Sequence, residues 1–213
     1  MAEALLHGTL LTRLQPVETP DAVTVLCDAF RDYPVMQYVL GSADDYDRRL
    51  RTLIDFFVSA RVFREEPVLG LYDRDGTLAA VALVTLPGER PAPEALSVQR
   101  EAVWKELGAA ERGRYEGFGT ACAQFSVESP HHHLNMIGVR RSYMGRGFAR
   151  KLLEAVHQLS DADDGSAGVS LSTEAAHNLP LYEHFGYRQL SHAVVGPGLE
   201  TWAFFRPGRK RSM

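Results

Sequence analysis

The sequence predicts a mixed α/β protein, and three observations point to this fold class. Strand-like and helix-like apolar patterns alternate along the 213 residues, a turn signal joins two of the strands, and another strand enters a helix through a glycine-rich turn. Apolar residues make up 45% of the chain, which is enough to bury a sizeable core. We therefore expect a single domain over residues 1–213, with a helical insertion at about 91–127.

The predicted strands are about seven segments with the apolar pattern of a sheet. They are residues 5–14, 68–72, 78–86, 131–139, 169–173, 187–195 and 199–205. Asp73-Arg74-Asp75-Gly76 is a hairpin turn signal between the second and third segments. Gly196-Pro197-Gly198 joins the last two, which we expect to pair as antiparallel neighbours.

Apolar residues spaced three or four positions apart predict the helices. They fall at about 19–33, 50–57, 91–127, 148–159 and 180–185. Thr19-Pro20 supplies an N-cap followed by proline at the first helical position, and Pro34 breaks this first helix. Gly186 follows the last helix, where a left-handed C-terminal cap is usual.

Charge and composition exclude several classes of protein. The net charge of −4 and the isoelectric point of about 6.1 do not fit a nucleic-acid-binding protein. Cys27 and Cys122 stand far apart in apolar surroundings, so we expect buried free thiols in a reducing compartment. No signal segment or membrane-spanning apolar run is evident, and we expect a cytoplasmic protein without membrane or nucleic-acid partners.

The strand at 131–139 has an irregular apolar pattern. Leu134 and Met136 are at even positions, whereas Ile137 and Val139 are at odd positions, so the parity changes between Met136 and Ile137. A strand buried on both faces explains this change, and so does a β-bulge. A bulge would open a gap beside the neighbouring strand, in which an extended ligand would lie against the backbone.

The stretch GVRRSYMGRGFARKLLEAV, from Gly138 to Val156, connects that strand to the next helix. It lacks the pattern of a Walker A loop, and Arg150 stands where a dinucleotide fingerprint has its third glycine. A solvated loop is the simplest explanation of such a turn. The combination of strand, basic glycine-rich turn and helix N-terminus also suits a pyrophosphate, with Arg146 as a charged clamp.

The same residues resemble a known family. VRRSYMGRGFA, Val139 to Ala149, is similar to motif A of the GNAT superfamily of acetyl-CoA-dependent N-acetyltransferases, whose pattern is Gln/Arg-x-x-Gly-x-Gly/Ala. The downstream stretch STEAAHNLPLYEHFGY resembles its motif B, and within it Asn178 to Tyr182 is similar to the puromycin N-acetyltransferase-like group. Met144 replaces the usual Gln or Arg, and Arg141 occupies a position that is often proline.

The resemblance implies both a fold and a set of cofactor contacts. The fold is a mostly antiparallel twisted sheet of about seven strands with helices on both faces, in which a bulged fourth strand splays from the fifth. Acetyl-CoA is the implied co-substrate, with no metal. Its implied contacts are Ile137, Gly138, Val139, Met144, Gly145, Arg146, Gly147, Phe148, Ala149, Arg150, Asn178 and Tyr182. Arg146, Arg150 or Arg140 would supply the charge that Met144 lacks.

The chemistry of acetyl transfer requires an acid and a base. Tyr182 lies one helical turn after Asn178 and would protonate the departing thiolate, while Asn178 would bind the pantetheine arm. A packed aromatic ring and a helix N-cap are the structural alternatives for these two residues. For the base we favour His133 among His131, His132 and His133, acting through water.

Alternatives remain open for the base and for the function. Glu128 and Glu174 are other candidate bases, each also explained as an ordinary surface carboxylate. The function we expect is acetyl transfer from acetyl-CoA to a primary amine of a small molecule, by direct attack on the thioester. The alternatives are a non-catalytic acyl-CoA-binding or sensory domain, or a protein or peptide N-acetyltransferase.

The acceptor is the least constrained part of this interpretation. In the family its site is built from the first helices and the last hairpin, here around residues 30–38 and 192–204. Asp28, Asp32 and the cluster Asp44, Asp45 and Asp47 are acidic groups that would attract a cation. We expect a monomer or a homodimer, and the insertion at 91–127 would cover the acceptor cleft or form a dimer contact.

Overall fold

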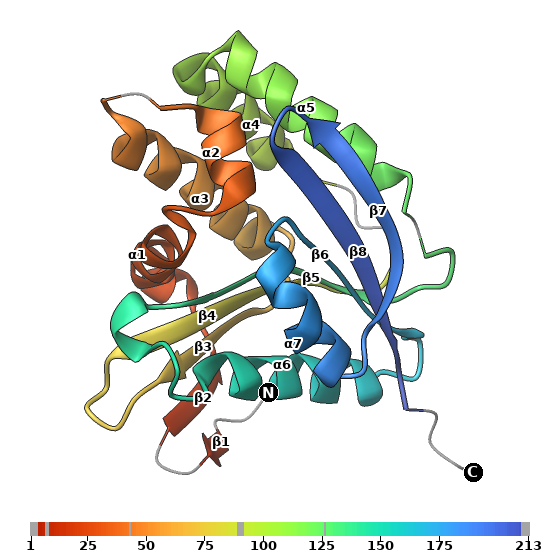
Figure 1. Ribbon diagram of the computed structural model, residues 1–213. Helices are drawn as coiled ribbons and strands as arrows, with labels where there is room; N and C mark the ends of the chain where they lie inside the picture. The colour runs from red at the N-terminus through yellow and green to blue at the C-terminus, as the bar shows by residue number, and fades with distance from the viewer. Residues whose placement is uncertain (1–3, 7–8, 43, 89–91, 126, 210–213) are drawn as a thin grey trace.

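A single twisted sheet organises the protein (Figure 1). The computed structural model describes residues 4–6, 9–42, 44–88, 92–125 and 127–209. Across them the sheet has the strand order β1-β2-β3-β4-β5-β6-β8-β7. The strands are β1 (Ala4–Leu6), β2 (Thr9–Arg13), β3 (Val68–Tyr72), β4 (Leu78–Thr85), β5 (His132–Val139), β6 (Gly168–Thr173), β7 (Arg188–Gly196) and β8 (Leu199–Pro207).

The pairing confirms the predicted fold class. β5 and β6 are parallel, and the remaining neighbours pair in the antiparallel sense. One strand prediction was wrong in detail, because the segment 5–14 forms the two strands of a hairpin, β1 and β2, rather than one strand. The predicted turn at Asp73–Gly76 is confirmed, and Gly76 adopts the left-handed φ of 77° that the turn requires.

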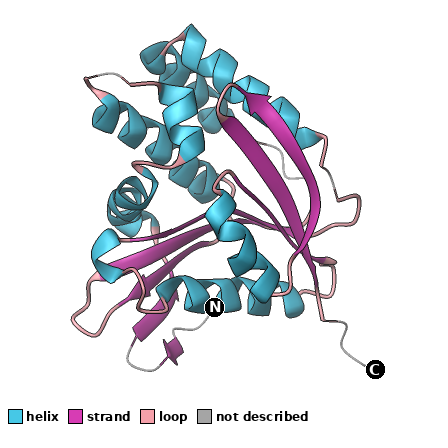
Figure 2. Ribbon diagram, viewed as in Figure 1, coloured by secondary structure: helices cyan, strands magenta, loops and turns pink. Residues whose placement is uncertain are grey.

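Helices cover both faces of the sheet (Figure 2). They are α1 (Thr19–Phe30), α2 (Pro34–Leu40), α3 (Tyr46–Phe63), α4 (Glu94–Leu107), α5 (Ala109–Ala123), α6 (Phe148–Asp161) and α7 (Leu179–His184), with short 3-10 turns η1 (Pro16–Glu18), η2 (Arg141–Tyr143) and η3 (Ala176–Asn178). α1 to α4 share one apolar core with one face of the sheet, and α6 packs with α7 on the other. The opposed packing buries both sides of the central strands.

The sequence prediction missed α2. The first helical pattern was expected to end before Pro34, and α1 does end at Phe30. The same proline then begins α2 at its first position, where its missing N–H costs no hydrogen bond and its fixed φ suits a helix. The intervening Tyr33 is extended, so its side chain turns inward between the two helices.

The predicted bulge is present in β5, one residue earlier than the sequence suggested. Leu83 of β4 pairs with Met136 and Val84 pairs with Leu134, so Asn135 is the extra residue. As a result Leu134 and Ile137 pack in the core below the sheet with α6, whereas Met136 packs in the core with α1. The change of parity therefore belongs to a bulge, and it re-aims the strand as it approaches the basic turn.

β5 and β6 separate beyond this bulge. Their parallel pairing covers only His132 to Leu134 on β5, opposite Val169 to Leu171 on β6. Further along, β5 stays paired with β4, and β6 stays paired with β8. The two strands thus diverge into a V-shaped opening, as the fold prediction requires, and backbone at its edge faces a gap instead of a neighbouring strand.

The predicted helical insertion is occupied by α4 and α5. α4 packs on α3 through the buried Leu96, Val103 and Trp104, while α5 lies beside β7 (Figure 1). α5 has no fully buried residue, and Tyr115 and Phe118 are its half-buried contacts with the core. The pair closes the side of the molecule opposite α6, which places it over the V-shaped opening.

Candidate active site

The turn between β5 and α6, residues 140–147, is called the basic loop from here on. Gly145 and Gly147 have φ angles of 75° and 80°, a region that side chains disfavour, and a Cβ at either would point into open space. Gly147 is the N-cap of α6, a helix of 14 residues. The first-turn N–H groups of such a helix lack partners within the helix and carry its positive dipole end. The loop therefore has the geometry expected of an anion-binding turn.

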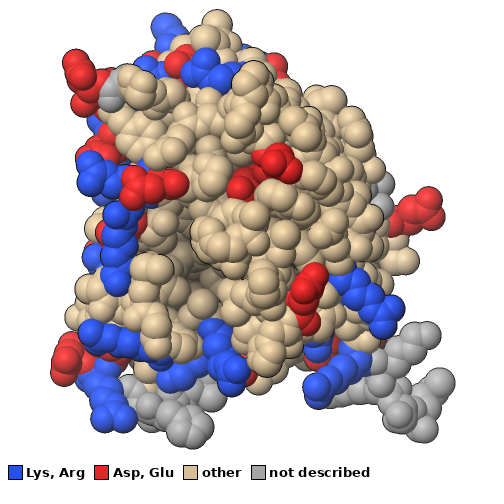
Figure 3. All heavy atoms as spheres, in the orientation of Figure 1, with Lys and Arg blue, Asp and Glu red and all other residues tan. Residues whose placement is uncertain are grey.

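Two arginine side chains, Arg146 in the basic loop and Arg150 in the first turn of α6, carry positive charge at this site. The guanidinium of Arg146 lies 5.1 Å from the centre of the Tyr143 ring, and Tyr143 donates a hydrogen bond to Asp73 on the β3–β4 turn. Arg150 lies over the ring of Phe185, at 5.7 Å. Met144 is 68% exposed and supplies no charge. Figure 3 shows Lys and Arg along the lower edge of the molecule, where Figure 1 labels α6.

The predicted loop residues differ in their positions. Phe148 is buried against Tyr143, with ring centres 5.4 Å apart, so it anchors the start of α6. Ala149 is half-buried and Arg150 is exposed. Arg140 donates to the carbonyl oxygen of Leu78 at 2.8 Å and ties the loop to β4. The structure therefore leaves Arg146 and Arg150 as the exposed cations of the set.

A cavity of about 660 Å³ lies at the V-shaped opening. It is within the size range of small-molecule sites. Predicted cofactor residues form one part of its wall, namely Ile137, Asn178 and Tyr182. The opposite part comes from α2, α3 and α5. The cavity is therefore lined both by Tyr182, which packs in the core with α6, and by residues of the core formed by α1 to α4.

Asn178 faces the cavity instead of capping α7. It occupies the N-cap position, but its side chain makes no cap hydrogen bond. Its amide donates to Thr173 Oγ1 at 3.4 Å, and the Tyr33 hydroxyl lies 3.0 Å from the same oxygen. The structural alternative for Asn178, a helix cap, is thus not the one the side chain adopts.

Tyr182 is buried at the base of α7 and lines the cavity. Its ring packs against Tyr187 and Phe204, with ring centres 5.8 Å from each. Burial raises the pKa of Tyr182 to about 12, and the charge of Glu174 adds to this increase. The phenol therefore keeps its proton at neutral pH, which is the state a proton donor requires.

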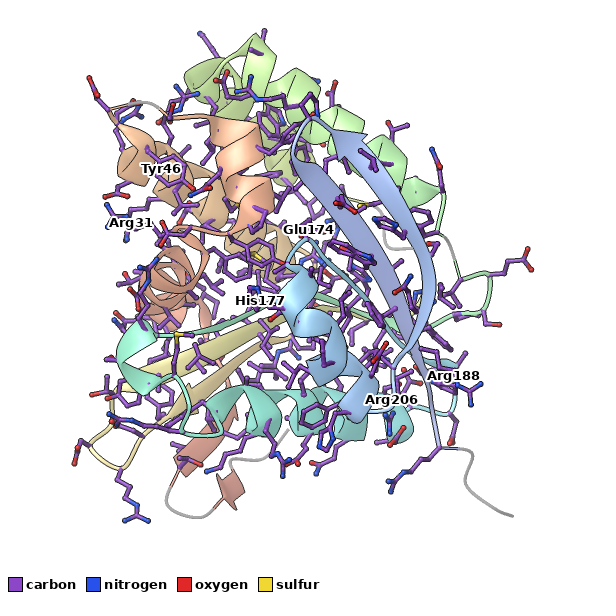
Figure 4. All side chains as sticks on the ribbon, in the orientation of Figure 1. Arg31, Tyr46, Glu174, His177, Arg188 and Arg206 are labelled. Carbon is purple, nitrogen blue, oxygen red and sulfur yellow. The ribbon has the colours of Figure 1, made fainter. Side chains whose placement is uncertain are left out.

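Glu174 is the buried carboxyl group of the cavity. It follows β6 directly and sits inside the molecule at the junction with α7, whereas Arg31 and Arg188 lie at the periphery (Figure 4). Thr201 Oγ1 of β8 donates to its Oε1 at 2.8 Å. Burial raises the pKa of Glu174 to about 7, although hydrogen bonds from Thr201, Tyr33 and Ser172 oppose the increase. A carboxyl group with this pKa exchanges protons near neutral pH.

The three histidines do not act as a group. His131 and His133 line the cavity, while His132 is buried beside Ser166. His133 Nδ1 lies 2.8 Å from Ser170 Oγ. Burial, together with nearby charges, lowers the pKa of His133 to about 4, so its ring is neutral at pH 7 and is a weak base there.

The acidic residues expected near the acceptor lie on the outer surface. Asp28 and Asp32 both contact Arg141 of the basic loop, at 2.7 Å to its N–H and 2.6 Å to its guanidinium. Asp47 forms an ion pair with Arg31 and Asp45 forms one with Arg48. These carboxylates are neutralised by neighbouring arginines and do not line the cavity.

The sequence placed two residues of the site only within broad ranges, 30–38 and 192–204, and did not predict their contacts with Glu174. Tyr33 belongs to no motif, yet its hydroxyl accepts a hydrogen bond from the N–H of Glu174 at 3.1 Å. Thr201 is fully buried on β8 and reaches Glu174 from 27 positions away in the chain. Only the three-dimensional arrangement of the α1–α2 connection, β6 and β8 brings these groups together.

The described part of the chain contains neither a metal-ligand cluster nor a membrane-spanning helix. Within the described ranges, no three His, Cys, Asp or Glu side chains converge as a metal site. None of the helices seen in the described part of the chain has the length and apolar character to span a bilayer. Cys27 and Cys122 are free and half-buried.

Comparisons with known proteins agree with this architecture. A family model described as an acetyltransferase (GNAT) domain matches residues 100–189. An uncharacterized N-acetyltransferase of Schizosaccharomyces pombe is 26% identical over 187 residues, covering 82% of this chain and 72% of the relative. The fold, the splayed strands and these matches support a GNAT superfamily N-acetyltransferase.

Solved structures show the same fold at lower sequence identity. A structure of histone acetyltransferase HPA2 and related acetyltransferase from Corynebacterium glutamicum has a TM-score of 0.73 at 20% identity, covering 95% of this chain and 98% of the other. A polyamine N-acetyltransferase of Drosophila melanogaster, which catalyses the formation of N-acetylagmatine, has a TM-score of 0.65 at 19% identity, covering 92% and 98%.

Proposed function

We propose that the protein transfers an acetyl group from acetyl-CoA to a primary amine of a small molecule. One observation carries the proposal: a buried phenol that keeps its proton and a buried carboxyl that exchanges one near neutral pH line the same cavity, at the opening between β5 and β6. Acetyl transfer to an amine needs one group of each kind.

The chain offers suitable contacts for coenzyme A. The basic loop and the N-terminus of α6 would hold the pyrophosphate, with Gly145 and Gly147 leaving space for close backbone approach. Arg146 and Arg150 would add charge. Asn178 and the open edge of β5, from Ile137 to Val139, would pair with the pantetheine arm. When bound, acetyl-CoA supplies an activated thioester.

Glu174 is the base that the geometry favours. It removes one proton from the bound ammonium, so that the free amine attacks the thioester carbonyl. A backbone N–H at the bulged edge of β5 polarises that carbonyl. His133 was the first choice from the sequence, and Glu128 is exposed outside the cavity; the lowered pKa of His133 makes Glu174 the better match to a neutral working pH.

Tyr182 completes the proton balance. As the C–N bond forms and the C–S bond breaks, its O–H donates a proton to the departing sulfur. The resulting phenolate recovers a proton as the new amide nitrogen loses its second one. The overall reaction converts an ammonium and a thioester into an amide, a thiol and one released proton, which the carboxylate of Glu174 passes to solvent.

The test is release of free thiol from acetyl-CoA with a panel of primary amines, aminoglycosides, aminonucleosides, polyamines and peptides. The expected result is amine-dependent thiol release, with the acetylated amine identified by mass spectrometry. Coenzyme A binding by calorimetry without release for any amine would instead support a non-catalytic acyl-CoA-binding domain. Release only with peptides would assign the protein to peptide N-acetylation.

A further inference from the structure

The wall of the cavity on the helical side is aromatic. We call six of its side chains, which come from α2, α3, α5 and the residue before α2, the acceptor wall. Its members are Tyr33, Met36, Phe56, Phe57, Tyr115 and Phe118. Phe57 stacks on Tyr115 with ring centres 5.8 Å apart, and Tyr115 also contacts Trp104 at 5.0 Å. Because these rings pack on one another and on the core, the surface offered to a ligand is apolar and already formed.

Charge is distributed unequally along this cavity. Of the described residues that line it, Glu174 is the one with an acidic side chain, whereas Arg61, Arg64 and Arg100 are cationic. Arg61 donates to Asn135 Oδ1 at 2.8 Å, and Asn135 belongs to the bulge on β5. Burial lowers the pKa of Arg61, the buried Glu66 raises it as an ion-pair partner at 3.1 Å, and the nearby Arg64 lowers it. The cationic groups thus gather near the first half of β5.

The acidic and cationic groups lie at different ends. His133 contacts Ser170. Its pKa is lowered by burial first and then by nearby charges that include Arg61. His133, Ser170 and Arg61 therefore lie together at one end of the cavity. Glu174 follows four positions after Ser170 along β6, which in extended backbone corresponds to roughly 13 Å. The acceptor wall occupies the interval. If the ammonium group of an acceptor amine lies at Glu174, the rest of that molecule would lie along the acceptor wall and point toward the arginines.

Resting on the proposed acetyl transfer, we propose that the acceptor is a primary monoamine with an aryl or alkyl body, and that a second cationic group on the acceptor is rejected. A second ammonium or guanidinium would be buried on the acceptor wall without a carboxylate, or would meet the arginines. Aromatic faces attract cations, but this gain is smaller than the cost of burying an unpaired charge. The chain would thus differ from the polyamine N-acetyltransferase whose fold it shares.

The test compares acceptors of matched length. We would measure kcat/KM for hexylamine, 2-phenylethylamine and 1,6-diaminohexane with the wild-type chain and saturating acetyl-CoA. The diamine has the same chain length as hexylamine and twice as many reactive groups. We nevertheless expect its kcat/KM to be at least about tenfold lower, since it must bury a second charge. A diamine equal to or better than hexylamine would overturn the inference and leave acetyl transfer itself standing.

A charge reversal tests the same point without relying on the fold of the core. Arg64 is half-buried at the C-terminal cap of α3, and Arg64→Glu should raise the diamine-to-monoamine ratio at least about threefold. Arg188→Glu is the control, because Arg188 is exposed on β7 and does not line the cavity. The same diamine-to-monoamine ratio in Arg64→Glu and in Arg188→Glu would count against the inference.

Calorimetry separates this inference from the proposed function. We would titrate hexylamine and 1,6-diaminohexane into the protein with coenzyme A present. Tighter binding of hexylamine supports a monoamine site whether or not transfer follows. If no amine releases thiol, acetyl transfer is refuted. If the diamine binds as tightly as hexylamine, the monoamine site is refuted, and the two results are independent.

Discussion

The basic loop and the acceptor wall differ in almost every physical property. The loop is one continuous segment, exposed, cationic and set by two left-handed glycines. The acceptor wall is assembled from Tyr33 and side chains of α2, α3 and α5, and these are buried or half-buried. It lines a cavity in which Glu174 is the one acidic side chain among the described lining residues. In the proposed function the first region would bind through backbone geometry. The second would select through side-chain shape and charge.

The largest expected effect concerns the basic loop. Gly147→Asp should abolish coenzyme A binding, because Asp strains a backbone with φ of 80° and places negative charge where the pyrophosphate would lie. Calorimetry checks this. Gly198→Asp is a matched control, since Gly198 has φ of 78° and equally open space but lies in the β7–β8 turn. Unchanged affinity in a folded Gly147→Asp protein would remove the loop from the site.

The contrast explains what sequence reasoning achieved. Most strand and helix positions, the presence of the bulge and the basic loop follow from patterns within about 20 residues, and the structure has them. The segment 5–14, which forms two strands, is an exception. α2 was missed because a proline that ends one helix also begins another. The contacts of Glu174 depend on Thr201 and Tyr33, which are distant in the chain and carry no local signal. The roles of the site residues remain predictions.

The proton donor gives the next largest expected effect. Tyr182→Phe keeps the packing of the ring and removes the proton, so acetyl-CoA binding should persist while kcat falls about 10²- to 10⁴-fold. Single-turnover kinetics with a true acceptor measure the chemical step. Tyr187→Phe serves as control: it removes a neighbouring buried hydroxyl, bonded to His157 at 3.0 Å, outside the cavity. Equal losses in the two variants would argue against a specific role for Tyr182.

The pH dependence of kcat/KM should identify the general base. If Glu174 must be ionised to act, kcat/KM for the wild type should rise with pH through about 7, the pKa to which burial raises this carboxyl. Glu174→Gln should lower the rate about 10²-fold or more and remove this acidic limb. Glu128→Gln, an exposed glutamate, should change neither. An acidic limb that survives in Glu174→Gln but disappears in His133→Asn would return the role to the histidine.

The next smaller effect concerns the stability of the folded protein. Here Glu174→Gln should be favourable, although the same substitution should lower activity. Because the pKa of Glu174 is raised in the folded state, folding favours its protonated form, and wild-type stability should fall as pH rises from about 4.5 to about 7. Glu174→Gln removes that cost and keeps an acceptor for Thr201. Above pH 8 the variant should therefore be more stable, by on the order of 3 kcal/mol at most. Denaturant unfolding at pH 5 and pH 8 tests this, and a variant that is less stable at pH 8 would contradict the burial of an ionised carboxyl.

The smallest expected effect separates backbone from side chain in the basic loop. If N–H groups and the helix dipole hold most of the pyrophosphate, Arg146→Ala should weaken coenzyme A binding only roughly twofold to fivefold, because an exposed ion pair contributes little. Its signature should be salt dependence, since screening acts on an exposed charge more than on buried N–H groups. Affinity of the Ala variant should decline less steeply with added salt than that of the wild type. Arg146→Lys keeps the charge but loses the planar guanidinium that lies over Tyr143, so it should restore the salt dependence more fully than the affinity. A hundredfold loss in Arg146→Ala would mean that the side chain, and not the glycine-shaped backbone, dominates this half of the site.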